Sequence, residues 1–145
     1  GQCEPLIDGP DGLIIGCGSL AGSCLAAVEE LQKEGLSVGL INARFIKPLD
    51  KDTLLKRIQM SPWVVTVEEN TLHAGFGSAI LEAIHDAALH TGPIRRLGIP
   101  DQFIEHGDRA DLLSSLTLDA SGIAGVCREL SGHIATTAVA TPLQD

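Results

Sequence analysis

The chain has 145 residues, of which 44% are hydrophobic and 20% charged, so it can fold around one core of ordinary size. Its formal net charge of −9 disfavours a general affinity for nucleic acid or for an anionic membrane, because either would require a basic surface. No apolar stretch approaches the roughly 20 residues that span a bilayer, and no signal peptide is visible. Four widely spaced cysteines favour free thiols in the cytoplasm over disulfides or zinc.

Short apolar runs alternate with amphipathic segments along the chain. The expected strands are residues 4–7, 13–16, 38–43, 63–67 and 94–98. The expected helices are residues 19–34, 50–59, 78–90, 108–116 and 119–130, with Asp50 and Asp119 as N-caps. This alternation predicts a parallel sheet covered by helices on both faces. Residues 1–133 then form one domain and residues 134–145 a frayed tail.

Ligands of open α/β sheets gather beyond the carboxyl ends of the strands, and polar residues stand at those ends here. They are Gly16 to Ser19, then Arg44, then Glu68 to Asn70, then Pro100 and Asp101. Arg44 is the candidate binding residue, because a guanidinium suits a phosphate or a carboxylate and stays charged at any working pH. The alternative is a surface arginine paired with Glu68 or Glu69.

The stretch "GCGSLA", residues 16–21, satisfies the pattern G-x-G-x-x-G/A between a strand and a helix. It suggests a dinucleotide site, and Arg44 in place of an acidic ribose partner would suit the 2′-phosphate of NADP. The simpler interpretation is a tight turn that needs glycine. Glu68 and Glu69 are adjacent on a strand and must face opposite ways, so at most one faces a cleft. Capping or accepting backbone N–H groups is the expected role for them.

The sequence offers no complete catalytic set. It has no P-loop, no G-x-S-x-G elbow, and no G-D-G of the kind that holds a metal and a diphosphate. The histidines lack the spacing of a metal site, and only His73 and His106 lie in loops where they could approach a ligand. The chain is therefore expected to contain no catalytic, cofactor-binding or metal-binding residue of its own.

Four stretches together carry a family resemblance: "INARFIKPLD" (41–50), "VVTVEENTLHAGFGSAILE" (64–82), "LGIPDQFIEHG" (97–107) and "LLSSLTLDASGI" (112–123). They resemble the carboxyl-terminal domain of transketolase-like, thiamine-diphosphate-dependent enzymes. The first two would also suit transketolase itself or the beta subunits of 2-oxo-acid dehydrogenases. The last two resemble the 1-deoxy-D-xylulose-5-phosphate synthase family. Ala74 departs from the family's G-G-F-G-S and would be strained if that position needs a positive φ.

The resemblance implies a three-layer α/β/α sandwich around a five-stranded, mixed and mostly parallel sheet, with the first strand antiparallel at an edge. Pro5, which has no N–H to donate, agrees with an edge strand. The resemblance also implies that the chain is part of a longer enzyme. Thiamine diphosphate and Mg²⁺ would be bound by preceding domains, and the full-length enzyme would be a homodimer.

The resemblance implies an activity for that longer enzyme. Pyruvate condenses with D-glyceraldehyde 3-phosphate, and the products are 1-deoxy-D-xylulose 5-phosphate and CO₂. The chain would not be catalytic alone. It would supply dimer contacts and Arg44, which matches the family arginine expected to contact the phosphate of the aldehyde substrate.

Overall fold

The computed structural model describes the backbone of residues 1–139 and the side chains of residues 1–132. Five strands form one sheet: β1 (Glu4–Pro10), β2 (Gly12–Cys17), β3 (Val38–Asn42), β4 (Val64–Thr71) and β5 (Ile94–Ile99). Their order across the sheet is β1-β3-β2-β4-β5. β1 runs antiparallel to β3 at one edge, and the other neighbouring pairs are parallel. The predicted mixed sheet with an antiparallel first strand is confirmed.

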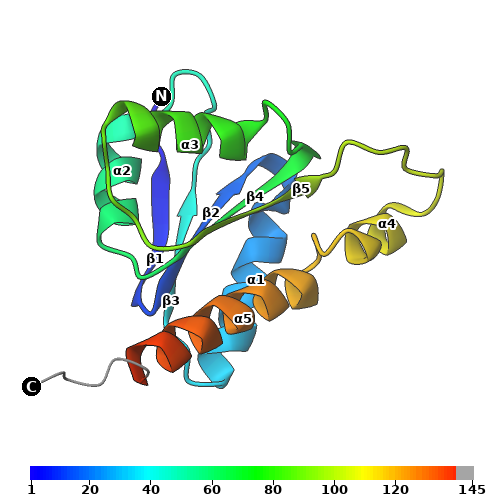
Figure 1. Cartoon of the computed structure of the whole chain (residues 1–145). Coiled ribbons are helices and arrows are strands. Elements are labelled where there is room, and N and C mark those ends of the chain that lie inside the picture. Colours follow the sequence, from blue (N-terminus) through cyan, green and yellow to red (C-terminus); the bar gives the residue numbers. More distant parts are fainter. Residues whose placement is uncertain (140–145) are drawn as a thin grey trace, which may run out of the picture.

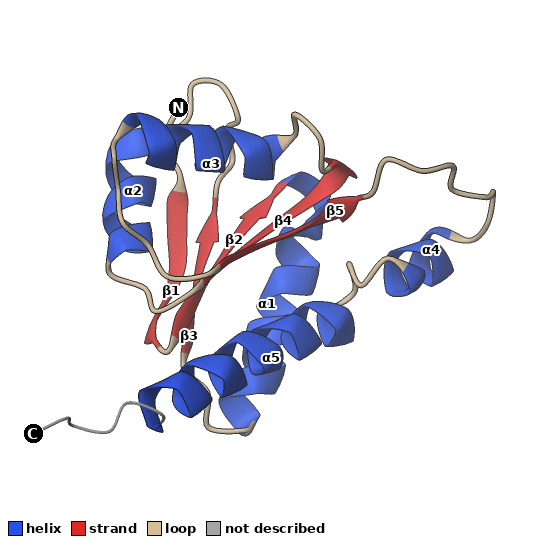
Figure 2. Ribbon diagram, viewed as in Figure 1, coloured by secondary structure: helices blue, strands red, loops and turns tan. Residues whose placement is uncertain are grey.

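Helices cover both faces of this sheet (Figures 1 and 2). They are α1 (Ala21–Lys33), α2 (Lys51–Gln59), α3 (Phe76–Asp86), α4 (Arg109–Ser115) and α5 (Ala120–Val139), with a 3₁₀ turn, η1 (Gly18–Leu20), before α1. α1 and α5 pack together on one face, and α2 and α3 lie on the other. The short helix α4 lies beyond the sheet, after a long loop that leaves β5.

The core consists of two apolar clusters, one on each face of the sheet. Ile14 faces α1 and α5, whereas its neighbours Leu13 and Ile15 face α2 and α3. Successive side chains of a strand point to opposite faces, so one buried run supplies both clusters. Leu118 and Ile123 close the first cluster from the carboxyl-terminal side. The three-layer α/β/α sandwich is therefore confirmed.

Several elements differ in length from the sequence prediction. β4 continues to Thr71, and α3 begins at Phe76 instead of residue 78. α3 ends at Asp86 because Ala88 adopts a left-handed φ of 49°, and Leu89 N–H donates to the carbonyl of Ile84, the pattern that closes many helices. Sequence reasoning missed this end because the left-handed residue is alanine instead of glycine.

The last helix also extends further than predicted. α5 continues to Val139, well past the expected end near residue 130. The predicted tail of residues 134–145 therefore begins inside this helix, and residues 140–145 lie outside the described part of the chain. Among the helices of the described residues, none combines the length and the apolar character needed to cross a membrane.

Candidate functional site

The carboxyl ends of β2, β3, β4 and β5 meet at one edge of the sheet, because these four strands are parallel. We call it the carboxyl edge. The loop after β3 contributes Arg44, and β4 contributes Glu68 and Glu69. The turn after β2 contributes Ser19, and the long loop after β5 leads to Arg109 at the start of α4. The edge predicted from the sequence therefore exists and carries the predicted residues.

Arg44 lies in a tight turn directly after β3. Phe45 N–H donates to the carbonyl of Ala43 across 2.6 Å, which makes Arg44 the central residue of a three-residue turn. Its φ of 57° is that of the rare form of this turn, a strained conformation for a residue with a side chain. Asn42 supports the turn, since its side-chain oxygen accepts from Arg44 N–H at 3.1 Å. The sequence did not reveal this strained backbone.

The guanidinium of Arg44 is exposed and stacks over the ring of Phe45, 5.7 Å from its centroid. Among the described side chains, it forms no ion pair with a carboxylate. Pairing with Glu68 or Glu69, the alternative left open by the sequence, is therefore wrong. The side chain is reachable from solvent and stands ready for a ligand or for another protein surface.

Glu68 is committed to the backbone of α3. Its side chain is buried, with the residue 2% exposed, and its two oxygens accept from Phe76 N–H at 2.7 Å and Gly77 N–H at 2.8 Å. These are two of the N–H groups that a helix leaves unpaired at its first turn, and a negative charge is favourable there. The expected role for a carboxylate at this position, accepting backbone N–H groups, is confirmed for Glu68.

Glu69 faces the other way, as the alternation of a strand requires. It accepts a hydrogen bond from the hydroxyl of Ser19 and two from Arg109, at 3.0 Å from Nε and 2.5 Å from Nη2. The Arg109 guanidinium, and then the Ser19 hydroxyl, hold the pKa of Glu69 below its ordinary value. Glu69 thus ties the turn after β2 to the first residue of α4, a connection that the sequence did not suggest.

The glycine-rich turn has a structural explanation. Gly18 has a φ of 72°, which favours glycine, and a Cβ on Gly16 would lie 3.0 Å from Cys24 Sγ. Glu69 places a carboxylate against Ser19 at this turn. The Ser19 hydroxyl is therefore already engaged by the protein and is not left to donate to a pyrophosphate, so the turn is poorly suited to a dinucleotide. The tight-turn interpretation of "GCGSLA" is favoured over an NADP site.

The remaining sequence candidates do not gather into a site. His73 and His106 are both exposed on loops. Within the described residues, no group of three or more His, Cys, Asp and Glu side chains could hold a metal ion. Ala74 has a φ of 56°, which is the positive value that the sequence comparison with the family's glycine anticipated.

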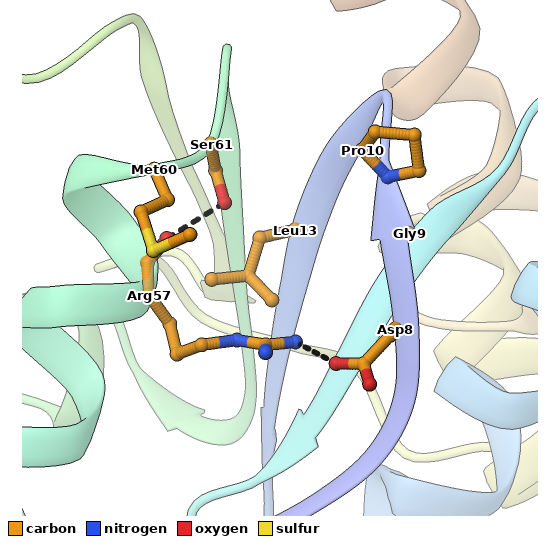
Figure 3. A pocket seen from close by; sticks show the side chains of 7 residues that line it. All are labelled: Asp8, Gly9, Pro10, Leu13, Arg57, Met60 and Ser61. Atoms are coloured by element: carbon orange, nitrogen blue, oxygen red, sulfur yellow. Dashed lines mark hydrogen bonds and ion pairs between the residues drawn. The ribbon is translucent and has the colours of Figure 1, made fainter.

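Three cavities lie away from Arg44. One of about 380 Å³ opens at the opposite edge of the sheet, between the β1–β2 turn and the end of α2, and Arg57 there contacts Asp8 at 2.5 Å (Figure 3). An adjoining one of about 520 Å³ shares Arg57 and Met60. A third, of about 300 Å³, follows β5 and includes Arg96. Arg44 lines none of these three cavities, and its position in a ligand cleft stays a prediction.

The sequence is similar to one family and to a set of named relatives. The family "Transketolase, C-terminal domain" matches residues 1–123. A 1-deoxy-D-xylulose-5-phosphate synthase of Rhodopirellula baltica is 43% identical over 92% of this chain and 21% of its own length. One of Bacillus velezensis is 48% identical over 81% of this chain and 19% of its own length. The chain thus spans about a fifth of the length of these relatives.

Solved structures agree with the fold. A chain described as a split-gene transketolase in an inactive beta4 tetramer superimposes with a TM-score of 0.82 and 25% identity, over 90% of this chain and 42% of its own. A transketolase of Pichia stipitis in complex with sedoheptulose 7-phosphate has a TM-score of 0.67 at 15% identity, over 92% of this chain and 18% of its own. Fold, sequence and motifs agree, and the chain belongs to the transketolase C-terminal domain family.

Proposed function

We propose that this chain is the carboxyl-terminal domain of a transferase that condenses pyruvate with D-glyceraldehyde 3-phosphate, forming 1-deoxy-D-xylulose 5-phosphate and CO₂. The names of the relatives support this activity, since each of those compared at 40–48% identity is a 1-deoxy-D-xylulose-5-phosphate synthase. The product would serve as a precursor of isoprenoids, thiamine and pyridoxal. Because the chain spans about a fifth of those enzymes, the remaining domains would carry out the bond-forming step.

Family membership implies thiamine diphosphate for the full-length enzyme, where it serves as an electron sink for carbanion chemistry. The residues of this chain do not fit that cofactor. The sequence lacks a G-D-G motif, and the carboxylates at the carboxyl edge are engaged by backbone amides, a serine and an arginine. We therefore assign thiamine diphosphate and Mg²⁺ to the preceding domains of the same enzyme.

Arg44 is the residue that we assign to substrate binding. The single observation that supports this role is an exposed guanidinium at the carboxyl edge, without a carboxylate partner in the described chain and fixed in a strained turn. Strained residues of this kind cluster at functional sites. A guanidinium binds phosphate bidentately, and contact with the substrate phosphate would orient the aldehyde without touching a reacting atom.

The same edge offers a surface for the rest of the enzyme. Phe45 is 39% exposed, Ile46 is 40% exposed, and Phe103 in the loop after β5 is 90% exposed. Exposed apolar side chains of this size favour burial against another protein surface. We propose that the preceding domains and the second protomer of a homodimer cover them.

A cytoplasmic location is proposed from the four unpaired cysteines.

Steady-state kinetics of the full-length enzyme test the role of Arg44. Arg44→Ala should lower kcat/KM for D-glyceraldehyde 3-phosphate by roughly 10- to 150-fold, because charged hydrogen bonds worth about 1.5–3 kcal/mol are lost. The kcat/KM of Arg44→Lys should lie between those of the unmutated enzyme and Arg44→Ala, since lysine keeps the charge and loses the fork of N–H donors. The kcat/KM for pyruvate, measured at saturating aldehyde, should change less.

Lys47 is the matched control, because it is an exposed cation three positions further along the same loop. Lys47→Ala should leave kcat/KM for the aldehyde within about twofold, as expected for a solvated surface charge. Unchanged kinetics in Arg44→Ala would remove Arg44 from the site. A full-length enzyme that does not consume pyruvate and the aldehyde at all would overturn the proposed activity itself.

A further inference from the structure

Arg96 on β5 is a partly buried cation held by neutral groups. Its Nη1 donates to the carbonyl oxygen of Leu72 at 2.7 Å and to Ser78 Oγ at 2.9 Å. Ser78 Oγ in turn donates to the same carbonyl at 3.0 Å. This arrangement fixes one end of the guanidinium against the loop between β4 and α3, so the direction of the planar group is set by the protein.

The rest of the guanidinium has no protein partner among the described residues. A guanidinium carries five N–H groups, and the two on Nη1 account for the two hydrogen bonds above. The groups on Nε and Nη2 form the side that receives two oxygens of a carboxylate or phosphate in parallel. Neither group is among the buried side-chain atoms without a partner in the described residues, so both are open to solvent and can receive an anion from it.

The chain has 19 acidic and 10 basic residues, and three of its six arginines have a carboxylate partner among the described residues. Of the other three, Arg44 and Arg95 are exposed, and Arg96 is the partly buried one. Arg57, similarly half-buried, contacts Asp8 at 2.5 Å. Arg109 contacts Glu69, and Arg128 contacts Glu30 and Glu34. Acidic partners are therefore available to arginines elsewhere on the surface, and the described carboxylates leave Arg96 without one.

Arg96 lines a cavity of about 300 Å³ between the free edge of β5 and the turn that follows α4. Gly98 belongs to its wall, and Gln102, Ser115 and Thr117 add polar side chains, whereas none of the lining residues is acidic. The hydroxyls of Ser115 and Thr117 donate to backbone carbonyls. The donors left for a ligand are the Nε and Nη2 groups of Arg96 and the amide of Gln102. A cavity of this volume is ample for a small anion.

We propose that this cavity binds the carboxylate or phosphate group of a small molecule, with Nε and Nη2 of Arg96 holding two of its oxygens and Gln102 donating to the same group. The site is distinct from Arg44, because β2 and β4 separate β3 from β5 in the sheet. It depends on neither the activity proposed above nor the role of Arg44, and either assignment can fail without the other.

Titration of the 145-residue chain by ¹H–¹⁵N NMR tests the site, with inorganic phosphate and acetate as probes at constant ionic strength. Both core clusters lie within this chain, and the dispersion of its spectrum reports that it is folded. Saturable shifts are expected at the backbone amides of Gly98, Gln102 and Thr117 and at Arg96 Nε. A dissociation constant on the order of a millimolar is expected for a few charged hydrogen bonds. Comparing the two probes distinguishes a phosphate site from a carboxylate site.

Arg96→Gln should raise the dissociation constant at least tenfold, whereas Arg95→Gln, the same charge change on the exposed neighbouring residue of β5, should leave it unchanged. If Arg96→Gln does not fold, Arg96→Lys replaces it in the test. Lysine retains the charge but loses the fork of N–H donors, so the dissociation constant should rise by less than the tenfold expected for glutamine. The proposal is overturned if the unmutated chain shows no saturable shifts in the cavity up to about 50 mM, well above the expected constant. Equal binding by the two glutamine variants would overturn it too.

Discussion

The cations near the two edges of the sheet differ in whether a carboxylate of the chain pairs with them. At the edge opposite the carboxyl edge, which we call the amino edge, Arg57 on α2 lies beside a cavity and contacts Asp8 of β1, so its charge is paired within the chain (Figure 3). At the carboxyl edge, Arg109 contacts Glu69, whereas Arg44 has no carboxylate partner among the described residues. Arg96, in the middle of β5, has none either. The cavity beside Arg57 therefore holds an arginine that is already paired, whereas the cavity beside Arg96 holds one without a carboxylate partner.

Carboxylates are present at the carboxyl edge, yet they accept hydrogen bonds from groups other than Arg44. Glu68 accepts from two backbone amides of α3, and Glu69 accepts from Ser19 and Arg109. These contacts hold the loops of the edge in place and leave Arg44 and Arg96 unneutralised. The difference between the edges thus depends on two hydrogen-bonded carboxylates, Glu68 and Glu69, which can be replaced one at a time.

The largest expected effect comes from removing Glu68. Glu68→Ala leaves the amides of Phe76 and Gly77 without their acceptor in a buried place, which should lower the free energy of unfolding by about 2–4 kcal/mol. Glu68→Gln keeps the shape and one acceptor oxygen, so its loss should be smaller. Urea unfolding followed by circular dichroism measures both. If Glu68→Ala left the free energy of unfolding unchanged, the carboxylate of Glu68 would not be bound to α3 and could pair with an arginine. The distinction between the edges would then disappear.

A second prediction concerns two alanines with positive φ, one near each edge. Ala74, at 56°, precedes α3 on the carboxyl side, and Ala88, at 49°, follows it on the amino side. Replacing either by glycine removes the steric cost of the left-handed conformation, although glycine also gains freedom in the unfolded chain. Each variant should be more stable by about 0.5–1 kcal/mol in the same unfolding experiment. If Ala88→Gly were more stable than the unmutated chain and Ala74→Gly were not, the loop before α3 at the carboxyl edge would tolerate the left-handed alanine better than the end of α3 does.

A smaller effect separates the arginines themselves. Arg57→Met should lower the free energy of unfolding by about 0.5 kcal/mol, because its partner Asp8 is largely exposed and such pairs contribute little. Arg44→Met should leave stability unchanged within about 0.5 kcal/mol, as for an exposed side chain without an ion pair. A large stability loss in Arg44→Met would give Arg44 a structural role and weaken its assignment to substrate binding.

The smallest expected effect is a pH dependence at Glu69. The Arg109 guanidinium and the Ser19 hydroxyl lower the pKa of Glu69 in the folded chain below its ordinary value of 4.5. Its contribution to stability is therefore complete above pH 4.5 and is lost as the pH falls through the lower folded pKa. Stability of the native chain should fall more steeply below pH 4.5 than that of Glu69→Gln. Parallel curves for the two proteins would contradict the bridge between Ser19 and Arg109.

The sequence predicted the elements and the carboxyl edge because both depend on local patterns. Apolar spacing indicated α1 and its buried Cys24, Ala27 and Leu31, and an aspartate marked the start of α2, where Asp50 accepts from Thr53 N–H. Element ends were less predictable. The ends of α3 depend on Glu68, eight residues before the helix begins, and on an alanine in a conformation that its side chain disfavours.

The sequence alone determined the family, the layered fold and the position of Arg44 at the end of a strand, because periodicity, caps and motifs are properties of neighbouring residues. The tertiary structure alone decided which charges are matched. Arg109 reaches a carboxylate 40 residues away and Arg57 one 49 residues away, while Arg96 reaches none among the described residues. Such pairings depend on how distant strands and helices come together. No local pattern encodes them, and for this reason the cavity beside Arg96 could not be foreseen.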